Sequence, residues 1–140
     1  MKWFIDTNII SRLMRGNPEV KRHWARVPVD DLHLPAVVLA EGLTGAYRVG
    51  HDRYRTAWET IAQDYIIIPF DLAAAEAYAR LRADLEARGC MIGHRDCQIA
   101  ATALAYARLH PDEDITLVTD NVAEFSRVAG LRVENWVQRP

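Results

Sequence analysis

Short apolar runs alternate with longer amphipathic stretches along this 140-residue chain. Runs with the composition of strands occupy residues 2–6, 32–35, 65–70, 115–119 and 131–136. The third run, YIIIPF, is rich in β-branched residues, as buried strands are. Because helical stretches separate the runs, the pattern predicts β–α–β crossovers and a mostly parallel sheet.

Residues with helical spacing and polar caps fill the gaps between these runs. Helices are predicted at 8–15, 18–27, 36–50, 53–64, 72–89, 95–109 and 121–128. Asp71 precedes one helix as a cap, and Gly50 and Gly89 stand where two others should end. Helices on both faces of a parallel sheet define an α/β fold, which we expect to have three layers, α/β/α.

Length and composition limit how the chain is organised. Half of the residues are hydrophobic, enough for one sizeable core in a chain too short for two ordinary domains. No linker or repeat divides the sequence, so we expect a single domain over residues 1–140. No apolar run is long enough to span a bilayer, and the N-terminus lacks the features of a signal peptide. We therefore expect a cytoplasmic protein that makes no membrane contact.

Two acidic residues follow predicted strands directly. Asp6 comes after the apolar run at 2–5, and Asp120 comes after ITLVT at 115–119. Ligands of open α/β sheets bind in the crevice beyond the carboxyl ends of the strands. We therefore expect these two carboxylates to share one edge of the sheet.

Two further acids lie on the apolar faces of predicted helices. Glu41 follows Val37 and Val38 at helical spacing, and Asp96 stands in the first turn of the helix at 95–109. Four carboxylates at one edge would repel one another and raise one another's pKa unless a cation held them. A hard divalent cation bound through oxygen, Mg²⁺ or in its place Mn²⁺, suits such a set. Acids with such an ion favour metal-dependent phosphodiester hydrolysis by an activated water.

Four segments in order resemble the PIN-domain family, and most closely its VapC toxins: FIDTNIISRL, PAVVLAEGL, GHRDCQIAATALA and LVTDNVAEFSRVAGLRVENW. The resemblance covers nearly the whole chain. It implies a five-stranded parallel sheet and a Mg²⁺-dependent endoribonuclease, the toxin of a type II toxin–antitoxin module. It also implies that Asp6, Glu41 and Asp96 hold the metal and that Asn8 and Thr119 support them.

The fourth metal position is open in this sequence. PIN domains often have T-x-D-x-x-x-F here and many VapC toxins have T-N-N, whereas this chain has TDNVAEF. Counting back from Phe125 places Asn121 at the usual fourth position and Asp120 one residue earlier. We favour Asp120 for its charge, with Asn121 as the alternative metal ligand.

The partners follow mainly from the resemblance. It implies an RNA substrate, a VapB-type antitoxin that covers the acids, and a homodimer. The net charge of −2 gives the whole chain no general attraction to nucleic acid, yet fifteen of its 17 basic residues are arginines. Arg12 and Arg95 are candidate contacts for RNA phosphates. An alternative from another class is a catalytically silent PIN-like module that binds RNA or a partner protein.

Overall fold

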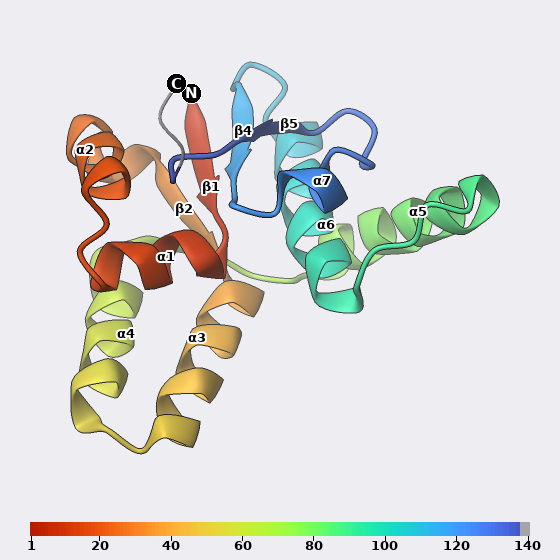
Figure 1. The fold of residues 1–140 in the computed structure, drawn as a ribbon. Coiled ribbons are helices and arrows are strands. Elements are labelled where there is room, and N and C mark those ends of the chain that lie inside the picture. Colours follow the sequence, from red (N-terminus) through yellow and green to blue (C-terminus); the bar gives the residue numbers. More distant parts are fainter. Residues whose placement is uncertain (138–140) are drawn as a thin grey trace.

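The computed structural model describes residues 1–137, which form one parallel sheet with helices on both sides (Figure 1). The strands are β1 (Lys2–Ile5), β2 (Leu32–Pro35), β3 (Ile66–Ile68), β4 (Ile115–Val118) and β5 (Arg132–Glu134). Their order in the sheet is β3-β2-β1-β4-β5, and every neighbouring pair is parallel. The α/β class and the five-stranded parallel sheet expected from the sequence are confirmed.

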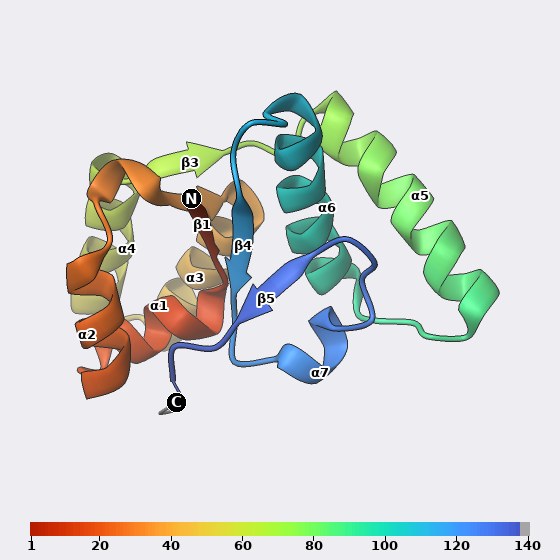
Figure 2. The same ribbon diagram turned by 90° about the horizontal axis from the view of Figure 1, so that it is seen from above.

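The helices lie where the apolar periodicity predicted them. They are α1 (Thr7–Met14), α2 (Pro18–Arg26), α3 (Ala36–Val49), α4 (Asp52–Asp64), α5 (Leu72–Arg88), α6 (His94–Leu109) and α7 (Val122–Phe125). Figure 2 shows α1 and α2 on one side of the sheet and α5 and α6 on the other, which confirms the three layers. The hairpin of α3 and α4 projects beyond the carboxyl ends of the strands (Figure 1).

Local side-chain chemistry sets several helix ends. The Asp6 carboxylate accepts from the backbone N–H of Thr7 at 2.7 Å and caps α1, and the Asp71 carboxylate accepts from the N–H of Ala74 at 3.0 Å and caps α5. Gly89 ends α5 with a φ of +65°, a conformation that favours glycine. These caps coincide with the helix ends expected from the sequence.

The helix predicted at 121–128 is shorter than expected, because α7 ends at Phe125. The Ser126 hydroxyl donates a hydrogen bond to the backbone carbonyl of Val122 at 2.6 Å. It therefore competes with backbone N–H groups for this helical acceptor. The N–H groups of the next two residues bond three positions back, to Glu124 and Phe125. The chain therefore tightens into a turn where the α-helix would have continued.

The core forms where the two central strands meet α6. Phe4 of β1 and Leu117 of β4 are fully buried, as are Ile99 and Ala103 of α6. Small residues on the buried side of α6 let this helix approach the sheet closely, and burial of the aliphatic side chains stabilises the contact. Since α6 is held against the centre of the sheet, its N-terminus is fixed beside the carboxyl ends of β1 and β4.

The prediction that residues 65–70 form a buried strand is wrong in one respect. The strand exists as β3, but it stands at the edge of the sheet and pairs only with β2. Ile66 is 40% exposed, and Ile67 and Ile68 are half-buried. A β-branched composition indicates a strand without showing how many neighbours the strand has.

Replacement by alanine is expected to have opposite effects on stability at two glycines of α3. A Cβ at Gly42 would overlap the indole ring of Trp58 on α4, so Gly42→Ala should lower the free energy of unfolding by about 1–3 kcal/mol. A Cβ at Gly45 would meet no atom within 4 Å, so Gly45→Ala should raise the free energy of unfolding by about 0.5–1 kcal/mol. Urea unfolding of both variants measures the difference. Equal effects would show that Gly42 does not control how α3 and α4 pack.

Within residues 1–137, no helix has the length and apolar character needed to cross a membrane.

Candidate active site

The carboxyl ends of β1 and β4, the first turn of α6 and the second turn of α3 surround one cavity of about 370 Å³. The residues that line it are Asp6, Thr7, Asn8, Ser11, Arg12, Arg15, Glu41, Asp96 and Asn121. Three of the four acids that the sequence singled out therefore meet here, one each from the end of β1, from α3 and from α6.

Asp6 is the most deeply buried of these acids, with only 4% of its surface exposed. Its carboxylate accepts from the Thr119 hydroxyl at 2.6 Å, from the Thr7 N–H at 2.7 Å and from the Asn8 amide at 3.2 Å. Burial raises the pKa of Asp6, and these donors oppose that rise. Thr119 and Asn8 thus fix the orientation of Asp6, in the positions expected of supporting residues.

Removal of the Thr119 hydroxyl is expected to destabilise the protein. Thr119 is fully buried, and its oxygen also accepts from the backbone N–H of Asn121 at 3.0 Å. Thr119→Val leaves both groups without this partner and should cost about 1–3 kcal/mol in the free energy of unfolding. Thr119→Ser keeps the hydroxyl and should cost about 1 kcal/mol for the lost methyl group. Thermal unfolding of both variants is the measurement, and equal losses would contradict a role for the hydroxyl.

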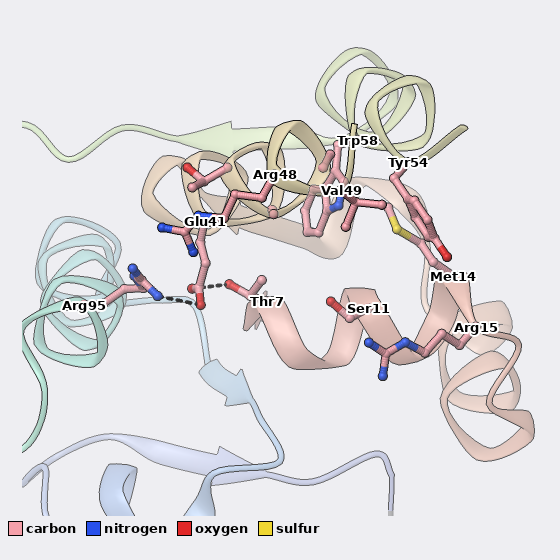
Figure 3. Close-up of a pocket in the computed structure, with 14 residues that line it drawn as sticks. Thr7, Ser11, Met14, Arg15, Glu41, Arg48, Val49, Tyr54, Trp58 and Arg95 are labelled. Atoms are coloured by element: carbon pink, nitrogen blue, oxygen red, sulfur yellow. Dashed lines mark hydrogen bonds and ion pairs between the residues drawn. The ribbon is translucent and has the colours of Figure 1, made fainter. Parts of the chain in front are cut away.

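Glu41 spans two partners across the cavity. One carboxylate oxygen accepts from the Thr7 hydroxyl at 2.7 Å, and the other accepts from the Arg95 guanidinium at 2.8 Å (Figure 3). The Glu41 side chain is 29% exposed and that of Arg95 is 59% exposed. The ion pair therefore lies where solvent can compete for it.

Asp96 shares a donor with an acid that the sequence analysis did not select. The Asn121 amide donates to Asp96 and to Glu124, at 3.1 Å in each case. Burial, a hydrogen bond to Glu124 and the charges of Asp6, Glu124 and Glu41 together raise the pKa of Asp96 to about 7. The hydrogen bond from Asp96 lowers the pKa of Glu124. Asp96 therefore stays protonated to a higher pH than an ordinary carboxyl group, and Glu124 stays ionised to a lower one.

Asp120 does not line the cavity. Its carboxylate accepts from Arg12 at 3.3 Å and from the Asn135 amide at 3.0 Å, while its backbone N–H donates to Asn8 at 3.1 Å. Asn121, the next residue, faces the cavity and contacts Asp96. Both arginines expected to contact RNA are paired with acids in this structure, Arg12 with Asp120 and Arg95 with Glu41.

The donor chemistry of the cavity fits a hard divalent cation. Its anionic groups are the carboxylates of Asp6, Glu41 and Asp96, which Mg²⁺ and Mn²⁺ prefer. Burial first, and then Glu124 and the charges of the other acids, raise the pKa of Asp96. Within residues 1–137, however, no three acidic, histidine or cysteine side chains are grouped closely enough to form a ready metal site. Thr7 and Arg95 hold Glu41, and Glu41 would have to leave Arg95 to join the others.

The fold and the acids at the carboxyl ends of its strands define a known class. Residues 3–131 match the family model of the PIN domain, and the chain belongs to the PIN-domain family. PIN nucleases are generally dependent on divalent metal ions.

The relatives of the chain within this family carry VapC names. Ribonuclease VapC1 of Rickettsia felis is 33% identical over 137 residues, covering 95% of each chain. The tRNA(fMet)-specific endonuclease VapC of Shigella flexneri is 28% identical, covering 97% of this chain and 98% of its own. The crystal structure of DNA-bound VapBC from Salmonella typhimurium matches 97% of this chain and 98% of its own, with a TM-score of 0.85 and 26% identity.

Proposed function

We propose that this chain is the toxin of a type II toxin–antitoxin module, a metal-dependent endoribonuclease that cleaves RNA by hydrolysis. The observation that carries the proposal is the meeting of Asp6, Glu41 and Asp96, from three separate elements, at one cavity. The relatives are named as a ribonuclease and a tRNA(fMet)-specific endonuclease, which supports the same activity for this chain.

Asp6, Glu41 and Asp96 would hold the cation, which we propose is Mg²⁺, with Mn²⁺ as a substitute. Asn121 and Glu124 stand beside Asp96 and would complete the set, in place of Asp120. When bound, such a cation lowers the pKa of a water and stabilises the negative charge that develops on the phosphate oxygens.

The other residues orient the acids and bind substrate. Thr119, Thr7 and Asn8 keep the oxygens of Asp6 directed at the cavity by hydrogen bonds. Below about pH 7, cation binding would displace a proton from Asp96, because the ionised carboxylate is the ligand. Arg95 is paired with Glu41 and, once Glu41 turns to the cation, becomes free to contact an RNA phosphate.

We further propose that a VapB-type antitoxin binds this chain, that the chain forms a homodimer, and that it acts in the cytoplasm. Several similar solved structures are VapBC complexes, among them VapBC2 of Rickettsia felis bound to a promoter DNA fragment. That structure has a TM-score of 0.83 to this chain at 27% identity, covering 97% of this chain and 99% of its own. An open cavity ringed by carboxylates is a site where a basic side chain of an inhibitory partner could bind.

Metal-dependent stabilisation tests the proposed site. Mn²⁺ at about a hundred times its Kd should raise the free energy of unfolding of the wild type by about 2.7 kcal/mol. Asp6→Asn should remove this gain, whereas Asp112→Asn, an exposed carboxylate in the turn before β4, should retain it. Thermal unfolding with and without Mn²⁺ and Mg²⁺ measures the effect. A gain that persists in Asp6→Asn would contradict the assignment of the cation to these acids.

A further inference from the structure

A second pocket opens from the cavity of the acids. It occupies about 450 Å³ between α1, α3 and α4, and we call it the α1–α3–α4 pocket. Thr7, Ser11, Arg15 and Glu41 line both this pocket and the cavity. The two spaces are therefore continuous, and a chain molecule held at the acids can extend into the pocket.

The pocket changes in character along its length. Figure 3 shows Glu41 and Arg95 at one end and Met14, Tyr54 and Trp58 at the other. Trp58 is 4% exposed, while Tyr54 is 37% exposed and has the Arg53 guanidinium over its ring, 5.2 Å from the ring centre. A polar end next to the acids and an aromatic end away from them suit a ligand with a charged part and a flat apolar part.

The charge of the pocket is positive. Arg15, Arg48 and Arg95 line it, and Glu41 is its single carboxylate. Within residues 1–137, the side chains of Arg15 and Arg48 make no hydrogen bond or ion pair. Two unpaired guanidinium groups beside a negatively charged cavity provide donors for phosphate oxygens.

Gly45 gives an independent indication. It lies inside α3 and lines the pocket, where glycine costs about 0.5–1 kcal/mol relative to alanine. Unlike Gly42, it faces no atom within 4 Å that would exclude a side chain. Packing among residues 1–137 therefore does not explain this glycine, and close approach of a ligand to the backbone is one use of glycine at such a position.

We propose that the α1–α3–α4 pocket binds one unpaired nucleotide adjacent to the phosphate that is cleaved, with its base at Tyr54 and its phosphate at Arg15 and Arg48. The inference rests on the proposed ribonuclease function. A base in a double helix is stacked and paired on both sides, so only an unpaired base can enter. The pocket therefore admits the base next to the cut only when that base is unpaired.

The observations favour RNA over a peptide as the occupant. The pocket is continuous with the acids at which a phosphodiester must lie, and Arg15 and Arg48 line it together with Tyr54. Stacking on an aromatic ring combined with arginine contacts to phosphate is typical of single-stranded nucleic acid sites.

Binding and cleavage of a fluorescein-labelled 14-nucleotide single-stranded RNA pool of random sequence test the proposal. In an Asp96→Asn background, Gly45→Leu should weaken binding at least tenfold, because its side chain fills the pocket. Tyr54→Ala should weaken binding about tenfold through lost stacking. Ala79→Leu, at an exposed position of α5, should bind as the background protein does. Thermal unfolding confirms that each variant is folded.

Cleavage is measured with Asp96 intact. Sequencing of the cleaved pool should show that the wild type prefers certain bases next to the cut. Gly45→Leu and Tyr54→Ala should each weaken this preference. Unchanged affinity and unchanged preference in both variants would overturn the proposal. So would unchanged RNA binding accompanied by loss of antitoxin binding, which would assign the pocket to a protein. A third outcome separates the two proposals. If RNA binds tightly and the pocket variants weaken it, but the wild type shows no metal-dependent cleavage, only the proposed ribonuclease function is contradicted.

Discussion

Asp96→Asn is expected to abolish RNA cleavage while making the metal-free protein more stable. The substitution removes a carboxylate proposed to hold the cation, so the variant should lose several kcal/mol of transition-state stabilisation. Such a loss lowers the cleavage rate at least about a thousandfold. It also removes a crowded charge, since burial and the neighbouring Glu124, Asp6 and Glu41 disfavour the ionised form of Asp96. The Asn amide still has a donor for Glu124 and an acceptor for Asn121.

The gain in stability has a defined pH dependence. Folding raises the pKa of Asp96 from 3.8 to about 7, so the folded state holds the proton more tightly than the unfolded state. The wild type therefore loses stability as the pH rises from 3.8 to about 7, and the loss is complete above about 7. Asp96→Asn should be more stable than the wild type by about 1 kcal/mol at pH 8, a value discounted for the solvent exposure of this group.

Urea unfolding without metal at pH 4 and pH 8 measures the change in stability. Cleavage of total RNA in the presence of Mg²⁺ measures the change in activity. The advantage of Asp96→Asn should nearly vanish at pH 4, and Asp112→Asn should match the wild type in both assays. An Asp96→Asn protein as active as the wild type would show that the metal-site assignment is wrong. An inactive variant without a stability gain at pH 8 would contradict the carboxylate crowding.

Glu124 and Asp120 are expected to differ sharply in their importance for cleavage. Glu124 shares the Asn121 amide with Asp96 and lies beside the cavity, so Glu124→Gln should lower the rate by about a hundredfold. Asp120 faces Arg12 and Asn135, so Asp120→Asn should stay within about threefold of the wild type. Single-turnover cleavage of one RNA by both variants at saturating Mg²⁺ is the measurement. The reverse order of effects would restore Asp120 as the fourth ligand.

The order of strands and helices was largely predictable, because short apolar runs and capping residues are local signals. Asp6 follows β1 and caps α1, so a single residue marked both an element boundary and the edge where ligands bind. The burial of each strand was less predictable. Ile66 has the same local sequence signal as a central strand residue, but its exposure depends on β3 having a single neighbour, which only the topology determines.

The fourth acid could not be read from charge and position alone. Thr119, Asp120 and Asn121 are consecutive, yet Thr119 and Asn121 turn toward the acids while Asp120 turns to Arg12. A helix was predicted around Glu124, but α7 is only four residues long, and no apolar face marked Glu124 as directed toward the other acids. Its spacing of three residues from Asn121 was the available signal, since a helical turn brings residues at that spacing to one side.

RNA cleavage in cells tests the central claim most directly. The wild type and Asp96→Asn would be induced in parallel in a bacterium that lacks any antitoxin, and new 5′-phosphate ends would be mapped across all cellular RNA. The account predicts discrete new ends in one or a few RNAs, present with the wild type and absent with Asp96→Asn. No new ends, in cells that contain folded wild-type protein, would contradict it and favour a catalytically silent binding module.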